Sequence, residues 1–198
     1  MGVGRNVGEL EAFRREKDRF FREDPRSPLT PEQRASFTGL VYYPEDPSLR
    51  IEAVLDTDVD RDEEIRMATT TGGEQVYRRA GVVRFEVEGR PAQVTLFASE
   101  GMPDLFLPFR DATSGVETYG AGRYLEVEPP GPDGRVVVDF NLAYNPYCCY
   151  DDGWSCPLPP RENWLDVPIR AGEKDFPGSK VPRGGRPGGA VDGPRRPR

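Results

Sequence analysis

The sequence predicts a mainly β domain of the α+β type, an antiparallel barrel or sandwich with one amphipathic helix before it. From Phe37 onward apolar residues recur with a period of two, and turn residues follow every eight to twelve positions. The pattern predicts nine strands but only one sizeable helix, which is typical of a mainly β fold. The 198 residues are 36% hydrophobic, which suffices for a single core.

Two helices are predicted near the N-terminus. Leu10, Phe13, Phe20 and Phe21 recur near helical spacing among charged residues, which indicates an amphipathic helix over about 7–23. Asn6 and Glu9 have capping-box spacing at its start, and Asp24-Pro25 ends it. The segment Thr30-Pro31-Glu32-Gln33 predicts a short helical turn with Thr30 as its N-cap.

Strands are expected near 37–43, 50–56, 64–70, 74–79, 82–88, 92–98, 104–108, 121–128 and 135–142. The clearest hairpin turns at Gly89, because apolar and charged residues alternate over 83–88 and apolar residues return at Val94 and Leu96. A second hairpin is predicted to pair 123–128 with 135–142 across a Pro/Gly-rich turn. The long aromatic and proline-rich stretch 143–168 is expected to be an irregular loop that covers a sheet edge or a barrel mouth.

Composition divides the chain into one β-rich domain over 1–174 and a tail over 175–198. Eleven of the 24 tail residues are Gly or Pro, and the tail carries a net charge of +4. We expect it to be disordered from about Gly178, because it has too few apolar residues to offset the entropy of ordering. The body then carries −11, from −7 minus 4, which disfavours nucleic acid as a main partner; weak contacts by the basic tail are the exception.

Histidine is absent, and this excludes several kinds of catalytic site. A Ser-His-Asp triad, a Cys-His pair and a histidine metal ligand are all impossible. We expect no metal and no cofactor. No window reaches the roughly 18 to 20 apolar residues of a membrane span, and the N-terminus lacks a signal-like apolar region, so a soluble, cytoplasmic protein without a membrane partner is predicted.

Arg123 is the most distinctive candidate site residue. If Leu125 and Val127 face the core, strand alternation turns Arg123 toward the interior as well. A buried guanidinium needs an acid or a ligand anion, so Arg123 closes a structural ion pair or clamps a ligand. Matching apolar faces across the second hairpin leaves Asp139 on the opposite face, and Glu117 is the expected partner.

The leading functional hypothesis is the binding of a small organic or anionic ligand at one end of the barrel. The candidate ligand-binding residues surround the second hairpin: Arg123, Glu117, Tyr119, Asp139, Asn141 and Tyr144. One alternative is a hydrolase that uses Asp111 and Glu117 as acid and base. Another is a scaffold or partner-binding module that uses the aromatic loop as its contact surface.

The three cysteines Cys148, Cys149 and Cys156 lie within nine residues. In a reducing compartment buried thiols are expected, and a bridge between Cys148 and Cys156 is the alternative. Their spacing fits no common zinc site.

The sequence resembles a family of uncharacterised bacterial and archaeal proteins that is catalogued as a domain of unknown function. The resemblance covers about residues 9–174 and rests on the segments GLVYYP (39–44), PFRD (108–111), ETYGAGRYL (117–125), DFN (139–141), AYNP (143–146), CPLPP (156–160), Asn163 and AGEK (171–174). The family usually has cysteines that match Cys148 and Cys156, whereas Cys149 is an addition. The resemblance implies no activity.

Overall fold

A computed structural model describes residues 8–179 of the chain. Seven strands, two α-helices and four short 3-10 helices make up this part. The helices are α1 (Glu9–Glu23), α2 (Pro31–Ser36), η1 (Pro47–Leu49), η2 (Phe140–Leu142), η3 (Tyr147–Cys149) and η4 (Arg161–Asn163). The strands are β1 (Arg50–Val54), β2 (Ile65–Ala68), β3 (Glu74–Val87), β4 (Arg90–Ala98), β5 (Leu105–Phe109), β6 (Arg123–Val127) and β7 (Arg135–Asp139).

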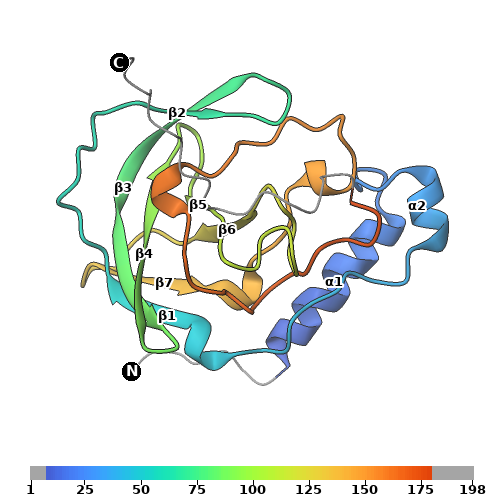
Figure 1. Cartoon of the computed structure of the whole chain (residues 1–198), viewed down its shortest axis with the longest axis horizontal. Helices are drawn as coiled ribbons and strands as arrows, with labels where there is room; N and C mark the ends of the chain where they lie inside the picture. Colours follow the sequence, from blue (N-terminus) through green and yellow to red (C-terminus); the bar gives the residue numbers. More distant parts are fainter. Residues whose placement is uncertain (1–7, 180–198) are drawn as a thin grey trace, which may run out of the picture.

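The fold is mostly β, with a curled five-stranded antiparallel sheet that forms a half-barrel (Figure 1). The strand order is β2-β3-β4-β5-β6, and β1 and β7 form a separate antiparallel pair. A bridge between Asp56 and Val82 joins the end of β1 to β3, and β7 lies next to β6. The main core fills the space between the two sheets, with Val83, Leu96, Leu107 and Val138 among its fully buried residues.

The hairpin predicted at Gly89 is confirmed as β3–β4. Val87 pairs with Arg90, and both turn residues have positive φ, 52° at Glu88 and 74° at Gly89, which gives the turn the twist that suits a tight hairpin. The strands predicted separately over 74–79 and 82–88 are one strand, β3. A bulge at Ala80 accounts for the apparent break. A Cβ at the next residue, Gly81, would lie 2.7 Å from the Asp56 carbonyl oxygen, so glycine permits the close approach of β1.

The predicted pairing of the second hairpin is wrong. β6 pairs with β5, with Arg123 opposite Phe109, and β7 pairs with β1, with Asp139 opposite Arg50. Alternation defined which face of each strand is buried, but it carried no information on the partner strand. The turn after β6 is long enough to let the chain cross from one sheet to the other. Residues 140–142, predicted as strand, form η2 because the Asp139 side chain accepts from the Asn141 amide and caps it.

The segment predicted as a strand over 37–43 is also corrected. It is extended but forms no strand, and its sheet-like contact is a single bridge between Tyr42 and Glu173. Two backbone hydrogen bonds, from Tyr43 to Gly172 and from Lys174 to Val41, hold this contact. A further hydrogen bond, from the Leu40 amide to the Asp18 carboxylate, joins the segment to α1.

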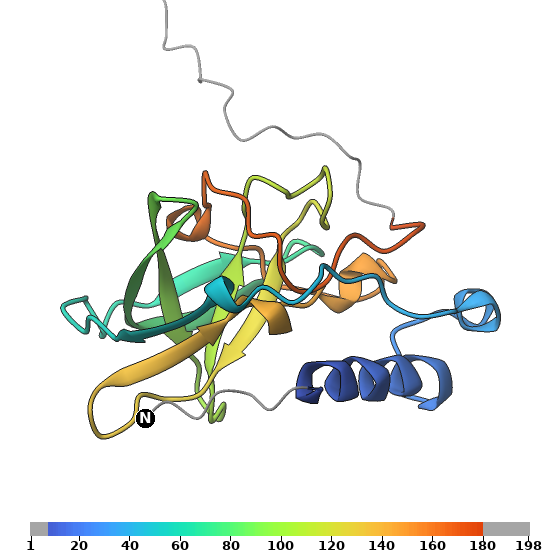
Figure 2. The ribbon, with the colours of Figure 1, turned by 90° about the horizontal axis from the view of Figure 1, so that it is seen from below.

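Both predicted helices are present. α2 has the expected capping box, in which Thr30 and Gln33 satisfy each other's backbone amides. α1 begins after Gly8 without a side-chain cap, and Asn6, the expected cap, lies outside the described residues. Figures 1 and 2 place α1 and α2 on one side of the molecule, away from β3 and β4. Over residues 8–179, neither helix is long and apolar enough to cross a membrane.

The stretch 143–168 is an irregular loop that covers the free edge of the sheet, as predicted. Tyr144 exchanges two backbone hydrogen bonds with Tyr124 of β6. Farther along the loop, Pro157 forms a bridge with Thr69. The chain stays packed beyond the predicted domain end at residue 174, because the Phe176 ring lies 5.0 Å from that of Tyr150. The rest of the predicted tail, 180–198, lies outside the described residues.

Candidate functional site

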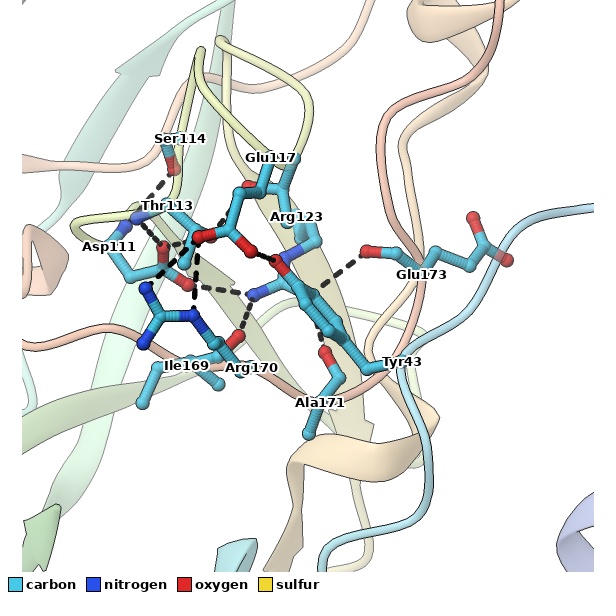
Figure 3. Close-up of polar contacts among 11 residues, drawn as sticks. Tyr43, Asp111, Thr113, Ser114, Glu117, Arg123, Ile169, Arg170, Ala171 and Glu173 are labelled. Atoms are coloured by element: carbon cyan, nitrogen blue, oxygen red, sulfur yellow. Dashed lines mark hydrogen bonds and ion pairs between the residues drawn. The ribbon is translucent and has the colours of Figure 1, made fainter. Parts of the chain in front are cut away.

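Arg123 is buried at the start of β6, as alternation predicts, with a relative exposure of 1%. Its Nη2 donates to Asp111 Oδ2 at 2.7 Å and to the Ile169 carbonyl at 2.7 Å. Its Nη1 donates to the carbonyls of Ala171 and Glu173 (Figure 3). The guanidinium therefore joins the sheet to the C-terminal segment 169–173, and both terminal nitrogens are engaged by the protein itself.

The acid that pairs with Arg123 is Asp111, and the expectation of Glu117 is wrong. Asp111 follows β5 by two residues, and β5 places Phe109 directly opposite Arg123. The other oxygen of Asp111 accepts from the backbone amide and the hydroxyl of Thr113. Glu117 lies at the far side of this turn. The buried Asp111 side chain, with Arg123 and Thr113 as its partners, therefore has a structural role.

Glu117 belongs to a second, more exposed group. Tyr43 donates its hydroxyl to Glu117 Oε2 at 3.0 Å, and Arg170 donates to Oε1 at 3.1 and 3.2 Å (Figure 3). The hydrogen bond from Arg170 lowers the pKa of Glu117, and Tyr43 lowers it further. Burial, together with the bond to Glu117, raises the pKa of Tyr43 to about 12. Glu117 is therefore ionised at neutral pH, which does not suit a general acid.

Substitution of Arg170 by alanine is expected to raise the pKa of Glu117 toward 4.5. Because this pKa is depressed in the folded protein, its contribution to stability is present above about pH 4.5 and is lost as the pH falls through the folded pKa. An NMR titration of the side-chain carboxyl measures the change. Arg135→Ala, which removes a partner of Asp133 instead, should leave the Glu117 titration as it is, and an equal effect of both variants would refute the assignment.

Asp139 and Asn141 form a separate structural clamp. The Asp139 carboxylate accepts from the amide and the side chain of Asn141, and Arg50 lies 3.7 Å from its other oxygen. Asn141 in turn accepts from the backbone amide of Asp46 and donates to its carbonyl. These bonds fix the residue before η1 to the end of β7. These hydrogen bonds give both side chains a role in the fold at the end of β7.

Tyr119 and Tyr144 lie in the aromatic region between α1 and the loop. Tyr119 donates its hydroxyl to the Cys148 carbonyl at 3.2 Å. Tyr144 donates to Glu126, and burial raises its pKa. Tyr144 is the predicted site residue that lines the cavity described next.

A cavity of about 780 Å³ lies between α1, the edge of β6 and the loop. Its lining is predominantly apolar and aromatic, with charges from two acids and one lysine. The lining residues are Phe13, Glu16, Lys17, Phe20, Phe21, Tyr124, Leu125, Glu126, Leu142, Tyr144, Pro146, Tyr147, Trp154, Ser155, Cys156 and Pro157. Sequence reasoning did not place α1 in a site, although Phe13, Lys17 and Phe20 share one helix face at i, i+4 and i+7 spacing.

The buried acid Glu173 attaches α1 to the body of the protein next to this cavity. Lys17 Nζ lies 2.6 Å from Glu173 Oε1, and the Glu173 side chain is 1% exposed. The other oxygen of Glu173 accepts from the Tyr150 hydroxyl at 3.0 Å and from the Asn145 amide at 2.8 Å. The Lys17 ammonium also lies 4.5 Å from the centre of the Tyr144 ring. Its charge is thereby neutralised within the fold.

The three cysteines are free thiols, and two of them interact. The Cys148 amide donates to Cys156 Sγ at 3.3 Å. The interaction between the two thiols lowers the pKa of Cys156 and raises that of Cys148. Cys149 is buried, and its pKa is raised by that burial. Among residues 8–179, no group of three or more cysteines and acids is arranged to hold a metal ion.

Comparison with known proteins places the chain in a family. The family model described as a protein of unknown function (DUF1684) matches residues 35–174. The chain belongs to this family. The solution NMR structure of an uncharacterised protein from Haloarcula marismortui is 41% identical to this DUF1684 chain, with a TM-score of 0.65, and the match covers 83% of this chain and 91% of that one. No curated protein matches the chain significantly. The helix α1 precedes the residues that the family model matches.

Proposed function

We propose that this DUF1684 protein binds a small, neutral, mainly apolar organic molecule in the cavity between α1 and β6. The observation that carries the proposal is the aromatic-lined cavity of about 780 Å³. Sites for organic ligands are usually concave, apolar and within about 300–1,000 Å³, with a few polar groups that orient the ligand. Ser155 and Cys156 supply such groups on one wall.

The charges around the cavity favour a neutral ligand over an anion. Among residues 8–179, Lys17 is the one cation that lines it, and that charge is engaged by Glu173. Glu16 and Glu126 also line it, and Arg19 is the partner of Glu16 whereas Glu126 accepts from Tyr144. Within the part of the chain that the structure describes, an anion would thus meet two carboxylates without a free cation to oppose them. The sequence left both small organic ligands and anions open, and these charges favour a neutral ligand. The proposed site is therefore the cavity lined by Tyr144, and it does not include Arg123.

A pair of fluorescent probes tests the proposal. N-phenyl-1-naphthylamine is neutral and apolar, and 1-anilinonaphthalene-8-sulfonate is its close relative with one negative charge. We expect saturable binding of the neutral probe to the wild-type protein, about tenfold tighter than binding of the anionic one. Absence of saturable binding of the neutral probe, or a clear preference for the anion, would contradict the proposal.

The double variant Phe13→Ala/Trp154→Ala tests whether the probe binds in this cavity. Both side chains line it, and both are more than 40% exposed, so their removal should leave the core intact. We expect the affinity for the neutral probe to fall about tenfold, because two aromatic contacts are lost. Val116→Ala removes an apolar side chain that is 77% exposed and is not among the cavity lining, and should leave the affinity unchanged.

A further inference from the structure

Cys156 lies on the wall of the cavity, and Cys148, which does not line it, belongs to the same cluster of buried residues. The Cys156 sulfur accepts a hydrogen bond from the Cys148 backbone amide at 3.3 Å. An amide donor on this sulfur stabilises its thiolate form, which is the nucleophilic form. The amide that donates belongs to Cys148 itself, so the second cysteine is held next to the Cys156 sulfur, an arrangement that favours disulfide formation after oxidation.

The turn between β2 and β3 holds Cys156 in this position. Thr70 accepts from the Cys156 amide at 3.1 Å, and its own hydroxyl donates to the Trp154 carbonyl at 3.0 Å. The Thr70 amide donates to the Cys156 carbonyl at 2.9 Å. On the other cysteine, the Tyr119 hydroxyl lies 3.7 Å from Cys148 Sγ. The two cysteines are therefore positioned by Thr70 and Tyr119, neither of which lines the cavity.

We propose that Cys156 is a nucleophilic thiol that reduces an organic hydroperoxide bound in the cavity, with Cys148 as the resolving thiol. This inference rests on the proposed function, because it takes its substrate class from the apolar cavity. The product of two adjacent thiols is a disulfide, so the bound oxidant must accept two electrons. A hydroperoxide does so without a metal or a histidine, since the weak O–O bond itself supplies the leaving group.

The reaction has three steps. The Cys156 thiolate attacks the terminal peroxide oxygen, the O–O bond breaks, and the alkoxide recovers the proton that the thiol had lost, which gives an alcohol and a sulfenic acid on Cys156. Cys148 sulfur then attacks the Cys156 sulfur, the S–O bond breaks, and water leaves with the Cys148 proton. An external dithiol reduces the disulfide by exchange and is itself oxidised, which restores both thiols.

Intact mass and a thiol count after treatment with cumene hydroperoxide test the inference. We expect the wild-type mass to fall by about 2 Da, with one of the three thiols left. Cys148→Ser should instead gain about 16 Da as the sulfenic acid, which dimedone traps. Cys156→Ser should show neither change, whereas Cys149→Ser, the matched control, should form the disulfide like the wild type. Hydrogen peroxide should react about tenfold more slowly, because it is polar and gains nothing from the apolar wall.

Two outcomes would overturn the inference: unchanged thiols in the wild-type protein, or a Cys156→Ser variant that reduces the peroxide as the wild type does. The neutral probe separates this failure from that of the proposed function. If Cys156→Ser and wild type bind the probe equally and neither reacts, the cavity binds ligands but the thiols have no such activity. If the wild type does not bind the probe but its thiols still react selectively with cumene hydroperoxide, the cavity assignment fails and the thiol chemistry stands.

Discussion

Replacement of Arg123 by alanine is expected to lower the free energy of unfolding by about 3 to 5 kcal/mol. The change leaves the Asp111 carboxylate, 0% exposed at its side chain, without its cation. It also removes the donor from three backbone carbonyls in the segment 169–173. Urea denaturation, followed by circular dichroism, measures the loss.

Two further variants make this prediction specific. Arg135→Ala removes a guanidinium that is about half exposed and 3.7 Å from its acid, so the loss should be below about 0.5 kcal/mol. Arg123→Met combined with Asp111→Leu removes both buried charges together and should be less destabilised than Arg123→Ala alone. If Arg123→Ala were as mild as Arg135→Ala, the buried pair would not be a structural element of the fold.

Replacement of Glu173 by alanine is expected to release α1 from the body and to cost about 3 to 5 kcal/mol. The carboxylate is the partner of Lys17, which is 17% exposed, and it also accepts from Tyr150 and from the Asn145 amide. The backbone carbonyl of Glu173 accepts from Arg123, and the substitution leaves that bond in place. The effect should therefore concentrate on α1 and the loop.

Hydrogen exchange distinguishes this local effect from a general one. In Glu173→Ala the amides of α1 should exchange much faster, whereas those of β3 and β4 should follow only the change in global stability. Glu11→Ala, which removes an exposed acid from the same helix, should leave the exchange of α1 nearly unchanged. Uniform acceleration over the whole chain in Glu173→Ala would show that Glu173 does not anchor α1 in particular.

Local signals in the sequence predicted the local structure. Thr30 and Gln33 indicated the capped start of α2, the alternation over 83–88 indicated the β3–β4 hairpin, and alternation in β6 indicated the burial of Arg123. Each of these depends on residues a few positions apart.

Partners that depend on tertiary contacts were not predictable in the same way. Glu117 is the nearer acid to Arg123 along the sequence, and only the pairing of β5 with β6 brings Asp111 next to the guanidinium instead. The salt bridge between Lys17 and Glu173 joins opposite ends of the chain. The cavity needs α1, β6 and the loop together, so its aromatic residues could not be separated from core residues by their type or spacing.

The most direct test of the central claim is an NMR measurement of intermolecular NOEs between isotope-labelled protein and bound N-phenyl-1-naphthylamine. The proposed site predicts NOEs from the probe to the rings of Phe20, Tyr147 and Trp154, which line the cavity from the helix and from the loop. Because NOEs arise only at contact distances, they locate the ligand without reference to affinity. NOEs confined to residues outside this lining would contradict the claim that the cavity between α1 and β6 is the binding site.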